Sequence, residues 1–134
     1  MREIKFRAWD NDKMYKCIVG NTDVKDNDYI CPLVWDKERK DWFHSDTCKI
    51  MQYIGLKDKN SKEIYEGDIV KFYSYELIKE YDICKIKWSG QYITYVAIDN
   101  LGNKHHIEAS DKNLLEVIGN IYENPELLEV ENEK

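Results

Sequence analysis

Long apolar runs, proline and glycine are all scarce in this sequence. Its 134 residues include 2 prolines and 6 glycines, and 43% are hydrophobic and 34% charged. So few prolines and glycines, together with a sizeable apolar fraction, exclude a disordered or collagen-like chain. Because apolar runs extend over a few residues only, we expect no membrane-spanning helix, no membrane partner and no signal peptide. The length predicts a single soluble domain, 1–134.

Paired cysteines are also absent. The four cysteines are Cys17, Cys31, Cys48 and Cys84. Zinc knuckles and ribbons take two thiolates from one turn, and no CxxC pair occurs here. We therefore interpret the cysteines as reduced, buried thiols. An alternative metal site would combine His44 and Cys48 with one of the first two cysteines. The adjacent His105 and His106 would point to opposite faces of a strand, so they are not expected to share an ion.

Basic clusters are missing as well. The net charge is −6, and residues 113–134 contain six acidic residues and one basic residue, which leaves the rest of the chain close to neutral. Proteins that bind phosphate chains usually carry a basic patch, so nucleic-acid binding is disfavoured unless folding gathers Lys5, Arg7, Lys85 and Lys87. The acidic C-terminal end is interpreted as solubilising, with partner binding as the alternative.

Alternation of apolar and polar residues indicates many short strands. The predicted strands are 3–9, 14–19, 29–35, 49–54, 63–65, 69–73, 81–88, 91–98, a short stretch near 106, and 115–122. Pro32 predicts an edge or irregular strand, Ser89-Gly90 a tight turn, and Gly119 a bulge. So many short strands with almost no helix predict an all-β, antiparallel small barrel or sandwich.

One short helix is expected near the C-terminus, with Asn124 as its N-cap and Pro125 at its first position. A weak seam near residue 49 divides the domain into an N-terminal β-hairpin region at 1–48, a small antiparallel barrel at 49–124, and a short acidic helix or tail at 125–134.

Catalytic motifs are not found: the chain has no glycine-rich phosphate loop, no GxSxG and no HExxH. Glu66-Gly67-Asp68 places two carboxylates around a glycine. A strand-entry turn explains this motif better than acid–base chemistry does. Gly67 would then adopt positive φ, and Asp68 would accept a local backbone N–H. Asp10 and Asp12 are interpreted as turn formers, with cation binding as the alternative. We expect no catalytic residue, no bound metal and no cofactor.

Aromatic residues are abundant, with 10 tyrosines and 4 tryptophans. Trp88, Tyr92 and Tyr95 lie in the best-defined predicted hairpin and are the candidate binding residues. Tyr92 and Tyr95 are expected on opposite faces of one strand, so one of them faces solvent. Exposed aromatics anchor protein interfaces or stack on unpaired bases; the alternative is core packing and cross-strand pairing.

Three stretches together carry a family resemblance. They are MREIKFRAWD at 1–10, MQYIGLKDKN followed by SKEIYEGDIVKF at 51–72, and LEVIGNIYENPELL at 115–128. The order of these stretches and the residues in them resemble the YopX family of bacteriophage and prophage proteins. The resemblance implies a phage or prophage origin, a place in the cytoplasm of the bacterial host, an all-β fold and a C-terminal SH3-like barrel. It implies neither an activity nor site residues.

Ser61 departs from the family pattern, which often has glycine after the asparagine of this turn. Because serine disfavours positive φ, we expect a looser turn or a turn of another type.

The function predicted from these features is that of a non-enzymatic module, which binds and modulates a host or phage protein through an aromatic barrel face. Single-stranded nucleic-acid binding is the main alternative. Self-association through an uncovered strand edge and an enzyme with a site assembled from scattered residues are the others.

Overall fold

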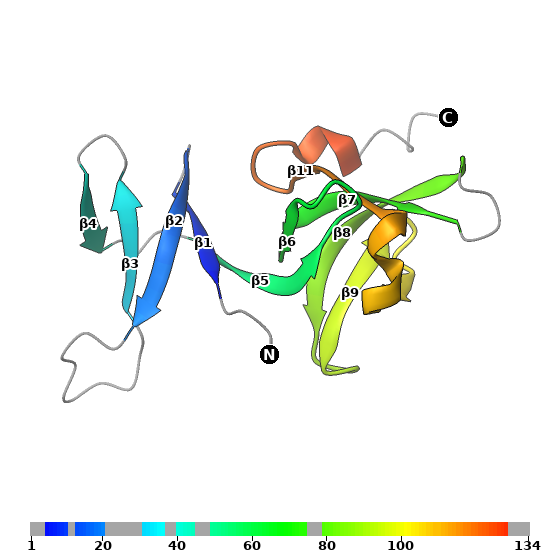
Figure 1. The fold of residues 1–134 in the computed structure, drawn as a ribbon, viewed down its shortest axis with the longest axis horizontal. Coiled ribbons are helices and arrows are strands. Elements are labelled where there is room, and N and C mark those ends of the chain that lie inside the picture. The colour runs from blue at the N-terminus through cyan, green and yellow to red at the C-terminus, as the bar shows by residue number, and fades with distance from the viewer. Residues whose placement is uncertain are drawn as a thin grey trace. The chain divides into compact units, whose positions relative to one another are not determined.

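The computed structural model divides into two compact units, Met1–Tyr53 and Ile54–Lys134 (Figure 1). It describes residues 5–10, 13–20, 31–36, 40–44, 49–74 and 79–128, with the backbone alone for 10, 15–20, 31–36 and 41–44. The expectation of a helical turn or loop within 75–80 and that of an acidic tail after Leu128 therefore lie largely or wholly outside the described residues. No helix in the described part is long and apolar enough to cross a membrane.

The first unit is an antiparallel sheet with the strand order β4-β3-β2-β1-β5. Its strands are β1 (Phe6–Asp10), β2 (Lys13–Gly20), β3 (Cys31–Asp36), β4 (Asp41–His44) and the first part of β5 (Lys49–Lys57). The predicted opening hairpin is confirmed, with Asp10 opposite Lys13.

The prediction of an edge or irregular strand around Pro32 is wrong, because β3 is paired on both sides. The last pair between β3 and β4 is Leu33 with His44, one residue short of Pro32. The proline therefore occupies the second position of β3, beyond the ladder to β4, where its missing N–H costs no hydrogen bond on that side.

The second unit is also antiparallel, and Figure 1 shows its sheet strongly curled. Its five-stranded sheet has the order β10-β9-β8-β7-β11, and β6 pairs with the end of β5. The elements are β6 (Glu63–Tyr65), β7 (Asp68–Tyr73), β8 (Tyr81–Ser89), β9 (Thr94–Asp99), β10 (Lys104–His106), β11 (Leu115–Asn120) and the 3₁₀ turns η1 (Ala109–Leu114) and η2 (Pro125–Leu128). The all-β, antiparallel prediction is confirmed, and the likeness to an SH3 barrel stays a prediction.

The core of the second unit lies on one face of β7, β8 and β9. Val70 is opposite Cys84, and Ile86 is opposite Ala97, and all four are fully buried. Directly paired residues point to the same side of a sheet, so these side chains form one apolar layer. Its other members are Ile54, Ile64, Tyr95 and Leu115.

Two local predictions for the end of the chain have different outcomes. The bulge at Gly119 is confirmed, because the register of β11 against β7 shifts between Val117 and Gly119. A methyl group at Gly119 would lie 2.5 Å from Asn124 Oδ1. The N-cap position of Asn124 is confirmed, because η2 begins at Pro125 and the Asn124 carbonyl accepts the N–H of Leu127 (3.1 Å). Its side-chain oxygen caps no helical N–H and accepts the N–H of Asn120 instead (3.2 Å). The expected helix is the single 3₁₀ turn η2, and η1 was not predicted.

The turn between β5 and β6 is organised by Asp58, whose side chain is 1% exposed. Its Oδ1 accepts the N–H groups of Asn60 (2.8 Å) and Lys62 (2.9 Å), and its Oδ2 accepts the N–H of Val117 (2.8 Å). Ser61 has φ 64, so the expectation that serine would avoid positive φ is wrong. The hydrogen bonds on both sides of Ser61 hold its backbone in a conformation that serine alone would not prefer.

Replacing Asp58 by alanine should strongly destabilise the protein. Three backbone N–H groups would lose a charged acceptor, and we expect a loss of about 3–5 kcal/mol in the free energy of unfolding, measured by urea denaturation. Asp58→Asn should also destabilise, because an amide cannot offer acceptors to both sides. Lys62→Ala is the control: its side chain is exposed, and a change beyond about 0.5 kcal/mol would contradict the assignment to Asp58.

Ser61→Gly should stabilise the protein, because glycine adopts positive φ without steric cost. We expect a gain of about 0.5–1 kcal/mol in the same measurement. Ser61→Ala retains the strained Cβ and should give no gain. An equal gain from both substitutions would show that backbone strain at Ser61 is not the cause.

Candidate functional site

An open groove of ≈ 810 Å³ lies in the second unit. Its wall combines aromatic rings with charged and hydroxyl groups. The lining residues are Phe72, Tyr73, Ser74, Glu80, Tyr81, Asp82, Lys104, His105, His106, Glu108 and Asp111. Four of the charged side chains are carboxylates and one is an ammonium group, so the groove favours a cationic ligand.

Strand register explains why polar residues meet here. Phe72 is opposite Asp82, Cys84 is opposite Asp99, and Ala97 is opposite His105. Since side chains alternate along a strand, Asp82, Asp99 and His105 share the face that carries the core. The apolar layer therefore ends in two carboxylates and an imidazole, and these three side chains are called the rim below.

Asp99 is the best-held group of the rim. Its Oδ1 accepts the N–H groups of Leu101 (3.0 Å) and Asn103 (2.9 Å), and its Oδ2 lies 2.9 Å from His105 Nε2. Burial raises the pKa of Asp99, but hydrogen bonds from His105 and from the backbones of Asn103 and Leu101 outweigh it. The net effect is a pKa below the usual value, so Asp99 is ionised at neutral pH.

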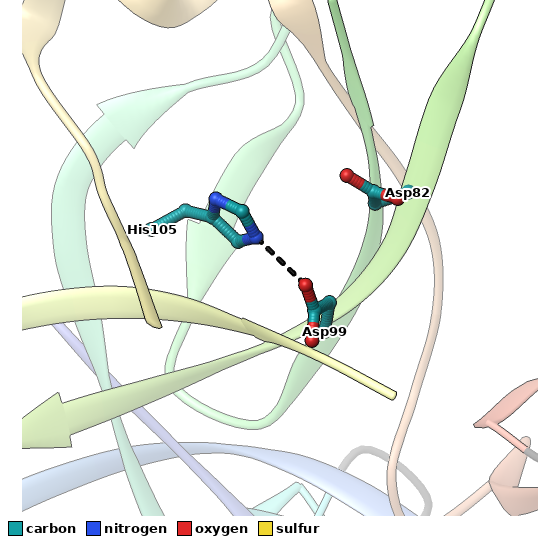
Figure 2. Close-up of side chains that lie close together, drawn as sticks. All are labelled: Asp82, Asp99 and His105. Carbon is teal, nitrogen blue, oxygen red and sulfur yellow. Dashed lines mark hydrogen bonds and ion pairs between the residues drawn. The ribbon is translucent and has the colours of Figure 1, made fainter. Parts of the chain in front are cut away.

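Asp82 completes a cluster of three side chains with Asp99 and His105, shown in Figure 2. One oxygen or nitrogen atom from each lies within 4.8 Å of the other two. Asp82 is exposed, whereas the other two are partly or largely buried. In the described part of the chain, these three are the residues placed to hold a metal ion.

A tyrosine and a glutamate form a second interaction beside the groove. The Tyr73 hydroxyl donates to Glu116 Oε1 at 2.9 Å. This hydrogen bond raises the pKa of Tyr73 most, followed by desolvation and by the charges of Glu116 and Tyr81. The ammonium groups of Lys59 and Lys71 lie 4.8 Å and 4.7 Å from the ring centres of Tyr73 and Tyr81, so both rings already have a cation on one face.

The predicted binding residues lie at the other end of the β8–β9 hairpin. Trp88 is 48% exposed and its ring meets that of Tyr95 edge-on at 5.1 Å, while Tyr95 is buried in the core. Tyr92 is 46% exposed and packs edge-on against His106 at 4.7 Å. One of the two tyrosines faces solvent, as predicted.

Tyr92 does not lie on a strand, however. The expected tight turn at Ser89-Gly90 is wrong, because the turn continues through Ile93 and β9 begins at Thr94. The N–H of Tyr92 donates to Ser89 Oγ (3.3 Å), and Ile93 has φ 54. The exposed residues Trp88, Tyr92 and Ile93 are called the hairpin tip below.

Ile93 was missed by the sequence reasoning. It is 76% exposed, and a β-branched residue at positive φ is a true outlier. Nothing in the local fold requires isoleucine there, since glycine or asparagine would fit the turn with less strain. The sequence signal was weak, because the stretch Tyr92-Ile93-Thr94-Tyr95 consists of aromatic and β-branched residues and therefore predicts a strand.

The other candidates from the sequence are assigned by their surroundings. Gly67 has φ 90 and the N–H of Tyr65 donates to Asp68 Oδ2 (2.8 Å), which confirms the strand-entry turn. Cys84 is a reduced thiol, fully buried in the core. The side chains of His44 and of the other three cysteines, and those of Asp10 and Asp12, lie outside the described residues.

The structure shows where the two adjacent histidines point and where the lysines considered for a basic patch lie. His105 meets Asp99 and His106 meets Tyr92, so the adjacent histidines do point apart. Of the lysines considered for a basic patch, Lys85 is half-buried and Lys87 is exposed on β8. The Lys5 ammonium, in the first unit, lies 5.9 Å from the ring centre of Tyr53.

Comparison with known proteins decides the family. The family model described as YopX protein matches residues 5–129. The chain belongs to the YopX family. The resemblance carried by the three sequence stretches is thus confirmed.

Two solved structures share the YopX-family fold. Protein EF1440 from Enterococcus faecalis is 23% identical, with a TM-score of 0.57, and the match covers 96% of this chain and 99% of that chain. Protein yopX from Bacillus subtilis is 21% identical, with a TM-score of 0.55 over 92% of this chain and 97% of that one. No curated protein matches the chain.

The interaction between Tyr73 and Glu116 predicts a change at alkaline pH. Because the pKa of Tyr73 is higher in the folded than in the unfolded protein, the hydrogen bond to Glu116 stabilises the fold fully at pH values below the unfolded-state pKa. This stabilisation is lost as the pH rises through the folded-state pKa. Glu116→Gln should lower the pKa of Tyr73, as measured by ultraviolet titration of tyrosinate against a Tyr73→Phe reference. An unchanged titration in Glu116→Gln would contradict this explanation.

Proposed function

We propose that this YopX-family chain is a non-catalytic binding module of phage or prophage origin, which binds a host or phage protein in the bacterial cytoplasm through the hairpin tip. Three of the five large hydrophobic residues that are exposed in the described part belong to this tip: Trp88, Tyr92 and Ile93. Aromatic side chains of this kind bury a large area with few rotors when they anchor an interface.

Ile93 carries the proposal. Its backbone strain and its exposed apolar side chain each cost stability in the isolated protein, and neither is offset by a contact that the fold needs. A side chain retained under both costs is explained when a partner buries it. An aliphatic group also favours a protein surface, because it offers no ring on which a base could stack.

Support for a non-catalytic role comes from three polar groups in or beside the groove, which serve the fold. Asp99 holds the turn after β9, the Asp111 carboxylate accepts the N–H of Glu108 (2.9 Å), and the Tyr73 hydroxyl is bonded to Glu116. These three groups are fixed by their hydrogen bonds before any substrate arrives, and proton transfer at any of them would break a bond that holds the fold.

Single-stranded nucleic acid is the second candidate for the same surface. Trp88 and Tyr92 are exposed rings, Lys87 is exposed on the same hairpin, and the Lys104 ammonium lies 5.9 Å from the Tyr92 ring centre. Rings and cations together are typical of stacking platforms. The Tyr92 ring, however, already packs against the His106 ring, with the ring centres 4.7 Å apart.

The test uses Ile93→Gly in an affinity pull-down of the full chain from bacterial lysate, with and without nuclease. Glycine relieves the strain, so the protein should gain about 1 kcal/mol in the free energy of unfolding. It should nevertheless retain at least about tenfold less of its protein partner, as should Trp88→Ala. Leu101→Ala is the matched control, since Leu101 is 82% exposed on another turn.

Three outcomes would contradict the proposal. Equal loss in Leu101→Ala would indicate non-specific adhesion, and full retention by Ile93→Gly would remove the tip from the interface. Recovery that disappears after nuclease, together with an oligonucleotide affinity that falls steeply with salt, would support nucleic-acid binding instead.

A further inference from the structure

We propose that Asp82, Asp99 and His105 form a binding site for one divalent transition-metal ion, with Zn²⁺ as the representative ion. This site lies at the groove and shares no residue with the hairpin tip. The three residues come from neighbouring strands, β8, β9 and β10, and therefore sit on a paired sheet and not on separate loops. A sheet fixes the spacing of its side chains better than loops do.

The register brings the three side chains together from diagonal positions. Asp82 is two residues before Cys84, which is opposite Asp99, and Asp99 is two residues after Ala97, which is opposite His105. Diagonal neighbours on one face are close enough for polar side chains to converge. The cluster follows from strand pairing alone.

The distances fit a small ion. Ligand atoms around four-coordinate zinc lie about 3.3 Å apart, given bonds of about 2.0–2.2 Å. All three ligand atoms are within 4.8 Å of one another, and Asp99 Oδ2 and His105 Nε2 are 2.9 Å apart because they share a hydrogen-bonded proton. The ion replaces that proton, which is released on binding, and the two atoms separate by about 0.4 Å. Asp82 would have to approach by at most about 1.5 Å, which its exposed side chain can do by rotation.

Asp99 is already positioned as a ligand. Its Oδ1 is held by the N–H groups of Leu101 and Asn103, which directs Oδ2 toward the imidazole. Bonds of this kind to the outer atoms of a ligand orient it and are characteristic of metal sites. Phe72 meets the His105 ring edge-on at 6.1 Å and restricts its rotation.

The chemistry of the ligands selects the class of ion. One imidazole nitrogen with two carboxylate oxygens suits Zn²⁺ and similar first-row ions, whereas Mg²⁺ and Ca²⁺ prefer oxygen ligands alone. Three protein ligands leave a coordination position for water or for a group from a partner. Glu80, Glu108 and Asp111 line the same groove and increase its attraction for a cation.

The test measures Zn²⁺ binding to the full chain by isothermal titration calorimetry after chelator treatment. The wild type should bind one ion, and both His105→Gln and Asp82→Asn should weaken binding at least tenfold. His106→Gln is the matched control and should differ from the wild type by less than twofold, because His106 packs against Tyr92 outside the cluster. Asp99 is left intact because it also holds the turn after β9.

Cobalt distinguishes this site from binding by cysteine. Co²⁺ at two carboxylates and an imidazole gives visible absorption without the thiolate charge-transfer band, and Asp82→Asn should change that spectrum. Circular dichroism should show that all three variants remain folded. The proposal is overturned by an absence of saturable Zn²⁺ binding, or by a thiolate band, which would assign the ion to cysteine. Binding that survives both His105→Gln and Asp82→Asn would also overturn it and would indicate an adventitious ion only.

Discussion

The carboxylate of Asp58 is the constraint on which the second unit depends. Two of its hydrogen bonds close the turn between β5 and β6, and the third reaches Val117, 59 residues further along the chain. The N–H of Lys59 adds a bond to the carbonyl of Leu115 (2.9 Å), a core residue. One buried charge therefore joins a local turn to the last strand, and it is tolerated because three N–H groups solvate it.

The same device recurs at other turns of this unit. Asp68 accepts a backbone N–H before β7, Asp111 accepts one at the start of η1, and Asn120 accepts two after β11, from Tyr122 and Glu123. Short polar side chains turned inward satisfy backbone groups that strand ladders leave unpaired. In a chain with few glycines and prolines, these side chains define the turns.

The β8–β9 hairpin separates two surfaces of different chemistry. At one end Trp88, Tyr92 and Ile93 present apolar groups to solvent, and at the other Asp82 and Asp99 present carboxylates beside an imidazole. Both ends are extensions of the same core strands, so each surface is held rigidly. The two surfaces adjoin at β10, where His106 and Lys104 line the groove and also lie against Tyr92, but the residues substituted in the two tests are different.

Local sequence was a good guide to strands and a poor guide to the residues at their ends. The alternation in 81–88 and the bulge at Gly119 were predicted because side-chain period and glycine conformation act over a few residues. The side-chain partner of Asn124 and the backbone conformation of Ser61 were misread, because hydrogen bonds with Asn120 and Asp58 override the residues' own preferences. Pro32 was misplaced because the extent of a neighbouring strand is not encoded locally.

The sequence by itself determined the YopX family, the antiparallel all-β class and the presence of exposed aromatic groups in one hairpin. Only the tertiary structure decided which aromatic is buried, that Ile93 stands strained at a turn, and that Asp82, Asp99 and His105 meet. The physical reason is that composition and alternation specify each strand separately. Register between strands, which depends on turns and on long-range hydrogen bonds, selects the side chains that become neighbours.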